Sequence, residues 1–266
     1  GLLHISEALG DWRAPNSWYQ RAIKERDEWD AYVKKQSGPT NQEEPSYAHA
    51  VGAVYRNSDP SDIVVTAAGG LVGEVVQVWK PRQLNTFETE WGFSCMGYEI
   101  SGALGIKMAK PDQDVVVFVG DGSYLLSNSD IYSSVLYGQK LIIIVCDNGG
   151  HMVINRLQLA KGGKEYICNL RAARATNLHF VDFENHAKSM GANAEKVSST
   201  SELEAAFKRA KASDKTYVIS VKTHGYEWLE GTAFWESPTL QDPITEDNKK
   251  ALDDFETGKN KQRRGV

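Results

Sequence analysis

Two short apolar runs near the middle of the chain, with a helical stretch between them, dominate its pattern of hydrophobic and polar positions. The runs cover residues 115–119 and 141–146, are rich in β-branched side chains and end in polar turns. Such runs are typical of strands that are buried on both faces of a parallel sheet. Residues 124–137 between them have helical spacing and offer one face four apolar side chains, Leu125, Ile131, Val135 and Leu136. The pattern predicts a β–turn–α–β unit.

The same alternation of strands and helices extends on both sides of this unit. Residues 63–68 are expected to form a buried strand that ends at Gly69 and Gly70, followed by a helix over residues 71–80. Further helices are expected over residues 46–56, 97–109, 151–160, 182–190 and 201–211, and a last strand over residues 217–222. Residues 85–96 and 161–176 are expected to lack regular structure. Such alternation predicts an α/β fold, a three-layer α/β/α domain with a mostly parallel sheet.

The chain divides into three parts by composition. Residues 1–45 are expected to be a connector from a missing upstream domain, because they are dense in charge and end in a polar break with two prolines. Residues 46–222 form the expected α/β domain, and residues 223–266 form a tail that becomes increasingly polar. The chain begins with glycine, which suggests a piece of something longer.

Composition narrows the classes of partner. The 266 residues are 41% hydrophobic, enough for a sizeable core, and carry a formal net charge of −5. This mild charge gives no reason to expect nucleic acid or a membrane surface as a partner. No apolar run approaches the ~20 residues that span a bilayer. The three cysteines include no CxxC pair, which fits a cytoplasmic location and gives no zinc signature. One of them, Cys146, ends a predicted core strand and is expected to be buried.

Polar residues that suit a metal-bound phosphate follow both strands of the central unit. Asp121 lies in the turn Gly120-Asp121-Gly122-Ser123 after the first strand, and Asn148 follows the second strand 27 residues later. If the strands are parallel neighbours, both side chains project from the same edge of the sheet. Two hard oxygen ligands and a turn carbonyl suit Mg²⁺, while Gly122 and Ser123 offer N–H groups and a hydroxyl to a phosphate. Either turn alone is more simply an ordinary turn, but together they favour a metal-bridged diphosphate.

These residues resemble the thiamine diphosphate motif, which has Gly-Asp-Gly, an interval of this length, and then Asn-Asn or a close variant. The resemblance implies that Asp121, the Asn148 side chain and the carbonyl of Gly150 bind Mg²⁺. Asp147 stands where the first Asn of the motif is common, but the metal-binding position, Asn148, is retained. The residues that the resemblance places against thiamine diphosphate are Gly69, Gly70, Leu71, Met96, Gly120, Asp121, Gly122, Ser123 and Asn148.

Two features upstream agree with this resemblance. Met96, 25 residues before Asp121, resembles the large apolar residue that props the cofactor between its two rings in acetolactate-synthase-like enzymes. Ordinary core packing is the alternative role for Met96. The turn Ala68-Gly69-Gly70-Leu71 resembles the first diphosphate-contacting turn of the family, and its glycines let backbone N–H groups approach an anion.

Longer phrases narrow the resemblance to one branch of the superfamily. The phrases WGFSCMGYEISGALGIKMA, VGDGSYLLSNS, HMVINRLQ and the Lys-Gln-Arg-Arg ending are similar to the trihydroxycyclohexane-1,2-dione hydrolases of myo-inositol catabolism. The resemblance runs from about Ser46 to the C-terminus. It implies a full-length enzyme that cleaves a C–C bond of this cyclic polyhydroxy dione to give 5-deoxy-glucuronate. It also implies a homo-oligomer, a dimer or tetramer, in which the pyrimidine-binding domain of a neighbouring subunit completes the site.

The residue that activates the cofactor cannot be named from this chain. In the family, the glutamate that protonates N1′ of the pyrimidine lies in the pyrimidine-binding domain, so the chain alone is expected to be inactive. His151, just past the metal-binding turn, is a candidate to reach the substrate, and an ordinary surface-loop histidine is the alternative. Other interpretations stay open: an acetolactate synthase-like enzyme or a decarboxylase, one subunit of a split enzyme, or a non-catalytic nucleotide- or phosphate-binding module.

Overall fold

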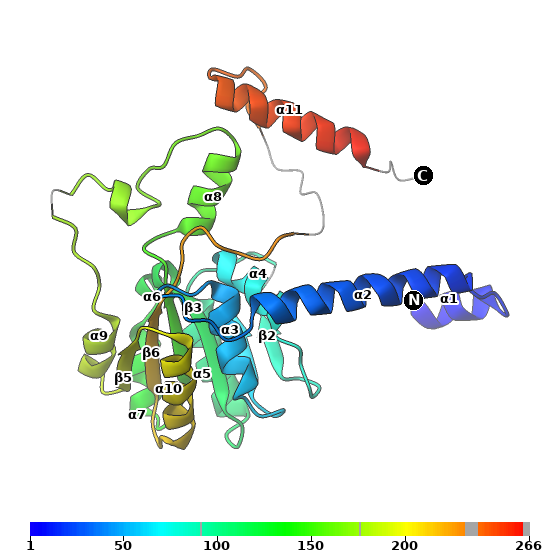
Figure 1. Cartoon of the computed structure of the whole chain (residues 1–266). Helices are drawn as coiled ribbons and strands as arrows, with labels where there is room; N and C mark the ends of the chain where they lie inside the picture. Colours follow the sequence, from blue (N-terminus) through cyan, green and yellow to red (C-terminus); the bar gives the residue numbers. More distant parts are fainter. Residues whose placement is uncertain (91, 176, 232–238, 263–266) are drawn as a thin grey trace.

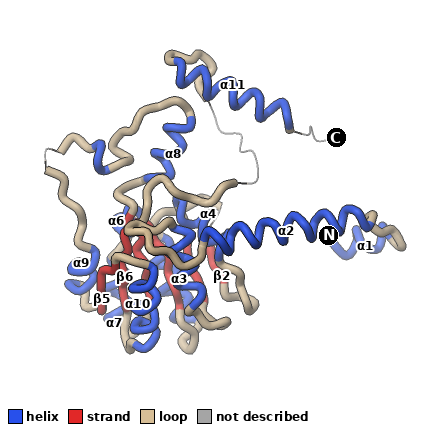
Figure 2. Tube along the Cα trace, in the orientation of Figure 1, coloured by secondary structure: helices blue, strands red, loops and turns tan. Residues whose placement is uncertain are grey.

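Six strands form one sheet at the centre of the computed structural model, which describes residues 1–90, 92–175, 177–231 and 239–262. The strand order is β2-β1-β3-β4-β6-β5, and every neighbouring pair is parallel (Figure 1, Figure 2). The strands are β1 (Ile63–Thr66), β2 (Phe87–Thr89), β3 (Val115–Gly120), β4 (Ile142–Asp147), β5 (Asn193–Val197) and β6 (Tyr217–Lys222). The predicted α/β fold is confirmed, and the sheet is parallel throughout the described residues.

Helices cover both faces of the sheet and make it the middle of three layers (Figure 1). One face carries α3 (Tyr47–Arg56), α4 (Gly69–Val78) and α10 (Thr200–Ala212), and the other carries α5 (Tyr98–Ala109), α7 (Ser129–Leu136) and α9 (Phe183–Ser189). Alternate residues of β3 and β4 point into the two cores, because successive side chains of a strand face opposite ways. Cys146 at the end of β4 is fully buried, as expected from the sequence.

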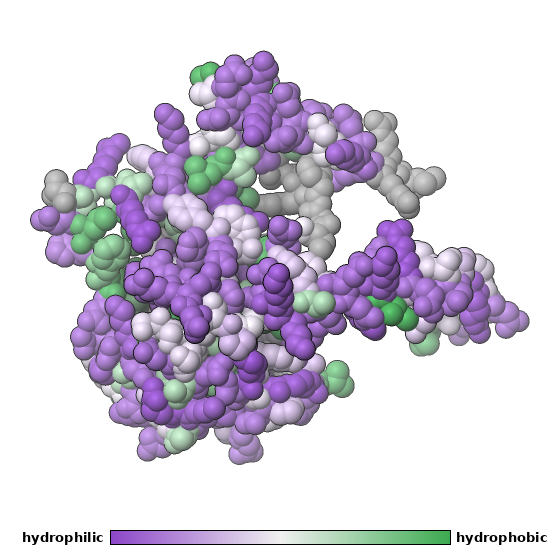
Figure 3. Space-filling view, in the orientation of Figure 1, coloured by the Kyte–Doolittle hydropathy of each residue, from purple (hydrophilic) through white to green (hydrophobic). Residues whose placement is uncertain are grey.

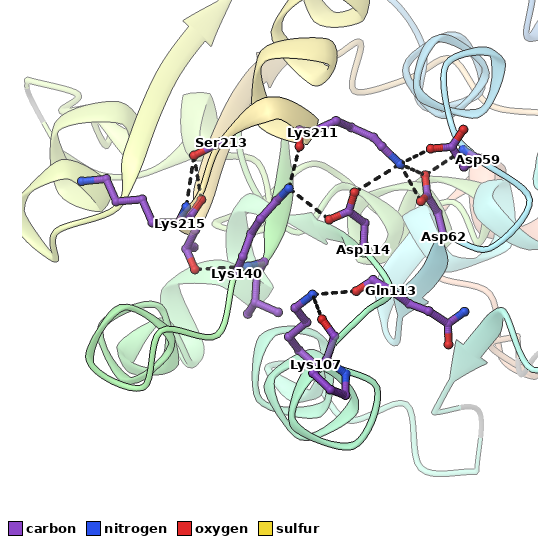
Figure 4. A network of polar contacts seen from close by, with 12 residues as sticks. Asp59, Asp62, Lys107, Gln113, Asp114, Lys140, Lys211, Ser213 and Lys215 are labelled. Carbon is purple, nitrogen blue, oxygen red and sulfur yellow. Dashed lines mark hydrogen bonds and ion pairs between the residues drawn. The ribbon is translucent and has the colours of Figure 1, made fainter.

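Ion pairs join distant segments at the amino ends of the strands (Figure 4). The ammonium of Lys211, on α10, lies 2.6 Å from Asp62 and 3.2 Å from Asp114, the residues that precede β1 and β3. Lys211 also pairs with Asp59 at 2.7 Å, and Asp114 pairs with Lys140, shortly before β4, at 3.0 Å. The network holds the amino edge of the sheet together. The polar turns predicted as a ligand site lie at the opposite, carboxyl edge.

The single helix predicted over residues 124–137 is wrong, because the structure has two helices there. α6 (Asp121–Leu126) begins directly at Asp121, and α7 begins only at Ser129. The side-chain amide of Asn128 donates to the carbonyl of Tyr124 over 3.1 Å and so takes an acceptor that a continuing helix would use. The break rotates the second half of the segment. Leu125 and Leu136, predicted to face the core, are 49% and 64% exposed.

Several elements lie where the sequence pattern predicts no regular structure or only a peripheral segment. β2 and β5 are the two edge strands, and their short, partly polar sequences lack a continuous apolar run. α1 (Leu2–Leu9) buries no residue, and α11 (Glu246–Lys261) buries only three. α4 also begins at Gly69, two residues before the predicted start. The division of the chain into connector, domain and tail stays a prediction.

The face of the molecule drawn in Figure 3 is mainly polar. The view in Figure 3 shows hydrophobic residues in small separate groups among hydrophilic ones. α2 (Asn16–Gln36) extends away from the sheet and buries only Val33 near its end (Figure 1). α8 (Met152–Ala160) lies on the side of the carboxyl edge and below α11 (Figure 1). None of the helices in the described part of the chain is long and apolar enough to cross a membrane.

Candidate functional site

The predicted site residues come together around one cavity at the carboxyl edge of the sheet. Gly120 of β3 pairs with Cys146 of β4, so the turns that follow these strands are neighbours. The cavity has a volume of about 330 Å³. Its lining includes all ten residues predicted to bind cofactor or metal, which are Gly69, Gly70, Leu71, Met96, Gly120, Asp121, Gly122, Ser123, Asn148 and Gly150. His151 lines the same cavity.

Asp121 is the acidic centre of this site and holds the two turns together. One carboxylate oxygen, Oδ2, accepts hydrogen bonds from the backbone N–H groups of Gly149 and Gly150 over 3.1 and 2.7 Å. The other, Oδ1, accepts from the N–H of Gly122 over 2.9 Å. Burial, and next the nearby charge of Asp147, raise the pKa of Asp121 to about 7. A cation bound here would offset both effects, because each disfavours the ionised carboxylate.

Asn148 lines the same cavity as Asp121 and has an unpartnered side-chain oxygen. Its amide Nδ2 donates to the hydroxyl of Tyr47 over 2.6 Å. Its Oδ1 is buried and has no hydrogen-bond partner among the residues that the structure describes. Buried polar atoms are normally satisfied, so such an atom at the edge of a cavity indicates a place for a ligand. An amide oxygen such as Oδ1 of Asn148 is a suitable ligand for a hard cation.

The third predicted ligand, Gly150, lies where only glycine fits. Its φ angle is +142°, and a Cβ atom built on it would lie 2.3 Å from the carbonyl oxygen of Cys168. The described residues contain no group of three His, Cys, Asp or Glu side chains that would suit a metal. A site of one carboxylate, one amide oxygen and a backbone carbonyl therefore suits Mg²⁺ or Ca²⁺ better than a transition metal.

Another part of the cavity lining is the start of a helix, which suits an anion. α4 begins at Gly69, whose φ of +80° favours glycine, and no side chain caps its first N–H groups within the described part of the chain. Free N–H groups at a helix start attract a negatively charged ligand. Glu99 holds the backbone just before this helix in place. Its carboxylate accepts hydrogen bonds from the N–H of Ala68 over 3.4 Å and from the N–H of Gly97 over 2.8 Å. Burial raises the pKa of Glu99.

Met96 and His151 both line the cavity. Met96 is 37% exposed and lines the cavity, as the proposed contact with a cofactor requires and core packing does not. His151 is exposed and precedes α8, with its ring against Gly122, where an added Cβ would lie 2.6 Å from the ring. A histidine in this place can reach a ligand in the cavity. Among the described residues, the structure assigns no activating glutamate.

Some lining residues are not among the site residues that the sequence predicts. Tyr47 comes from α3 and touches Asn148, which is 101 residues further along the chain. Ser94 and three residues at the start of α8, Met152, Val153 and Ile154, also line the cavity. Only the packing of α3 and α8 against the carboxyl edge brings these residues together. The phrases that carry the family resemblance contain Ser94 and residues 152–154 but give them no role in the site, and none of the phrases contains Tyr47.

The fold and the position of the cavity place this chain in a class of proteins. These are the α/β domains that bind a ligand at the carboxyl ends of parallel strands. Residues 67–221, more than half of the chain, match the sequence profile described as "Thiamine pyrophosphate enzyme, C-terminal TPP binding domain". The chain therefore belongs to the thiamine pyrophosphate enzyme family, in which it corresponds to the C-terminal domain that binds the cofactor. The family resemblance drawn from the Gly-Asp-Gly turn is confirmed.

The chain is also similar in sequence to individual curated proteins. The chain is 39% identical to a 3D-(3,5/4)-trihydroxycyclohexane-1,2-dione hydrolase of Halalkalibacterium halodurans over 175 residues, which are 64% of this chain and 27% of that protein. It is 34% identical to the protein of the same name from Listeria innocua over 242 residues, 87% of this chain and 38% of that protein. The chain thus spans between about a quarter and two fifths of these relatives.

Solved structures agree on the fold. A thiamine diphosphate-dependent 4-hydroxybenzoylformate decarboxylase of Rhodococcus jostii superimposes with a TM-score of 0.59 at 20% identity, covering 70% of this chain and 34% of that one. A benzoylformate decarboxylase of Polynucleobacter necessarius gives 0.57 at 22% identity, covering 71% and 36%. At this level of identity, the likeness concerns the arrangement of strands and helices alone.

Proposed function

We propose that this chain is the cofactor-binding part of a thiamine diphosphate-dependent hydrolase. The enzyme would cleave a C–C bond of trihydroxycyclohexane-1,2-dione, a cyclic polyhydroxy dione of myo-inositol catabolism, to give 5-deoxy-glucuronate. The observation that carries the proposal is the buried Oδ1 of Asn148, which has no partner among the described residues, in a residue that lines the same cavity as the buried Asp121. The names of the curated relatives supply the substrate.

Each wall of the cavity has a task in this proposal. Asp121, Oδ1 of Asn148 and the carbonyl of Gly150 would hold Mg²⁺. The uncapped start of α4 at Gly69 would bind the diphosphate oxygens. When bound, thiamine diphosphate supplies a carbon nucleophile and an electron sink. The chain itself orients these groups and keeps the metal ligands buried, which strengthens their hold on a cation.

The reaction requires groups outside this chain. We expect the glutamate that activates the cofactor, and half of the cofactor's contacts, to come from a pyrimidine-binding domain of a neighbouring subunit in a homo-oligomer. The chain alone should therefore bind the cofactor weakly and turn over no substrate. His151 remains the candidate within this chain to contact the substrate, because it lines the same cavity. A cytoplasmic location stays a prediction.

A chimeric enzyme tests the function. This chain would replace the matching C-terminal part of the Listeria innocua relative, and the chimera would receive trihydroxycyclohexane-1,2-dione, thiamine diphosphate and Mg²⁺. We expect NMR to show ring-opened product from the chimera, and none from the chimera carrying Asp121→Ala or from the 266-residue chain alone. Asp112→Ala, an exposed aspartate remote from the cavity, is the control that should keep activity.

Three results would contradict the proposal. Turnover by the isolated chain would show that no second domain is needed. A folded chimera that decarboxylates benzoylformate, or condenses pyruvate, but leaves the dione intact would favour a decarboxylase or an acetolactate synthase-like enzyme. Equal activity of the chimera with and without Asp121→Ala would remove the metal site from the mechanism.

A further inference from the structure

Tyr47 touches the proposed metal site from a part of the fold that the family motif does not include. It is the first residue of α3, and its ring packs against the core on that side of the sheet. A capping box fixes this end of the helix. The hydroxyl of Ser46 accepts from the N–H of His49, and the N–H of Ser46 donates to the His49 ring, each over 3.3 Å. The hydroxyl of Tyr47 is thus held in place and reaches the cavity.

This hydroxyl is the hydrogen-bond partner of the NH₂ end of the Asn148 amide. An asparagine side chain offers an oxygen at one end and an NH₂ group at the other. Here the NH₂ group donates to the Tyr47 hydroxyl over 2.6 Å, and the buried oxygen is left without a partner among the described residues. A cation is coordinated by the amide oxygen and is repelled by the partly positive NH₂ group. The contact with Tyr47 therefore leaves the oxygen of the Asn148 amide available to coordinate a cation.

We infer that Tyr47 is a positioning residue for the metal ligand Asn148. It gives the NH₂ group a buried partner and so stabilises the orientation in which Oδ1 meets a divalent cation. This inference rests on the proposed cofactor site. Without the hydroxyl, the metal-bound orientation would leave the NH₂ group unsatisfied, and a buried donor without a partner opposes that orientation.

The chain offers a matched control on the same helix. Tyr55 lies eight residues further along α3, and its hydroxyl also makes one hydrogen bond, to the carbonyl of Lys80 over 3.2 Å. Tyr55 does not line the cavity. Tyr47→Phe and Tyr55→Phe each remove one hydroxyl with its hydrogen bond and keep the packing of the ring. Only the first should change the metal site.

The test measures metal binding rather than activity. Mn²⁺, a paramagnetic substitute for Mg²⁺, would be titrated into the full chain with excess thiamine diphosphate, and binding would be followed by water-proton relaxation. We expect Tyr47→Phe to weaken Mn²⁺ binding about tenfold, the effect of one lost buried hydrogen bond. Tyr55→Phe should change it less than about twofold. Equal affinities of wild type and Tyr47→Phe would overturn the inference.

A double-mutant cycle separates positioning from a general structural effect. Asn148→Ala removes the ligand itself, so adding Tyr47→Phe to it should weaken Mn²⁺ binding no further. A further tenfold loss in that background would show that Tyr47 acts through something other than Asn148, and would overturn the inference. Failure of the proposed function gives a different result, in which wild type and Asp121→Ala bind Mn²⁺ alike. That result would remove the metal site and the inference together.

Discussion

Replacing Asp121 by asparagine should stabilise the protein at neutral pH while removing its metal site. Burial and the charge of Asp147 raise the pKa of this carboxyl from 3.8 to about 7, and the side chain is only 5% exposed. Each tenfold change in the proton affinity of a group corresponds to about 1.4 kcal/mol. An ionised Asp121 therefore lowers the free energy of unfolding by about 4 kcal/mol above pH 7.

The pH dependence of stability that Asp121 causes follows from the protons bound in the folded and unfolded states. Between about pH 4 and pH 7 the folded chain keeps a proton on Asp121 that the unfolded chain has released, so stability falls as pH rises through this range. Asparagine cannot titrate and avoids this loss. It is a poorer partner for the three backbone N–H groups of the turns, and losing one such bond costs about 1 kcal/mol.

The expected difference is measurable by urea unfolding at two pH values. The free energy of unfolding of Asp121→Asn, relative to wild type, should rise by about 3 kcal/mol between pH 5 and pH 8. Asp112→Asn, at an exposed position, should show no such change. The same Asp121→Asn variant should lose Mg²⁺-dependent binding of thiamine diphosphate, because the carboxylate ligand is gone. A stability difference that is independent of pH would refute the reasoning about burial.

Three other substitutions test the burial of Glu74 and the packing around two glycines. Burial raises the pKa of Glu74 from 4.5 to about 7, so Glu74→Gln should gain about 3 kcal/mol over wild type between pH 5 and pH 8 in the same urea assay, while thiamine diphosphate binding persists. An equal difference at both pH values would contradict this. Gly150→Ala should lower the melting temperature and abolish Mg²⁺ binding, because its Cβ would lie 2.3 Å from the carbonyl oxygen of Cys168 at a φ of +142°. Gly105→Ala, in α5 with no described atom within 4 Å of the new Cβ, should instead stabilise by about 1 kcal/mol. Calorimetric melting measures the stability of both glycine variants. A Gly150→Ala variant as stable as wild type would contradict the claim that only glycine fits at this position.

The centre of the sheet could be predicted because its residues leave few alternatives. β3 and β4 are apolar runs rich in β-branched residues with both faces buried, and such runs are typical of strands inside a parallel sheet. The edge strands β2 and β5 need only one covered side, so their sequences look like loops. The helix break at Asn128 could not be predicted, because apolar spacing alone cannot show that a side-chain amide competes for a helix carbonyl.

The site could be predicted only as far as its motif extends. Asp121 and Asn148 follow neighbouring strands, and a parallel sheet must bring such residues to one edge. Tyr47 and the start of α8 reach the cavity through tertiary packing. No local pattern records the contact between Tyr47 and Asn148, because 101 residues separate them and no spacing rule applies.

Calorimetric titration of thiamine diphosphate into the 266-residue chain, with and without Mg²⁺, tests most directly whether this cavity holds a metal-bridged diphosphate. We predict binding of wild type that requires Mg²⁺, and loss of that binding in Asp121→Ala but not in Asp112→Ala. Binding that is equally strong without Mg²⁺, or that survives the removal of Asp121, would contradict the proposed site.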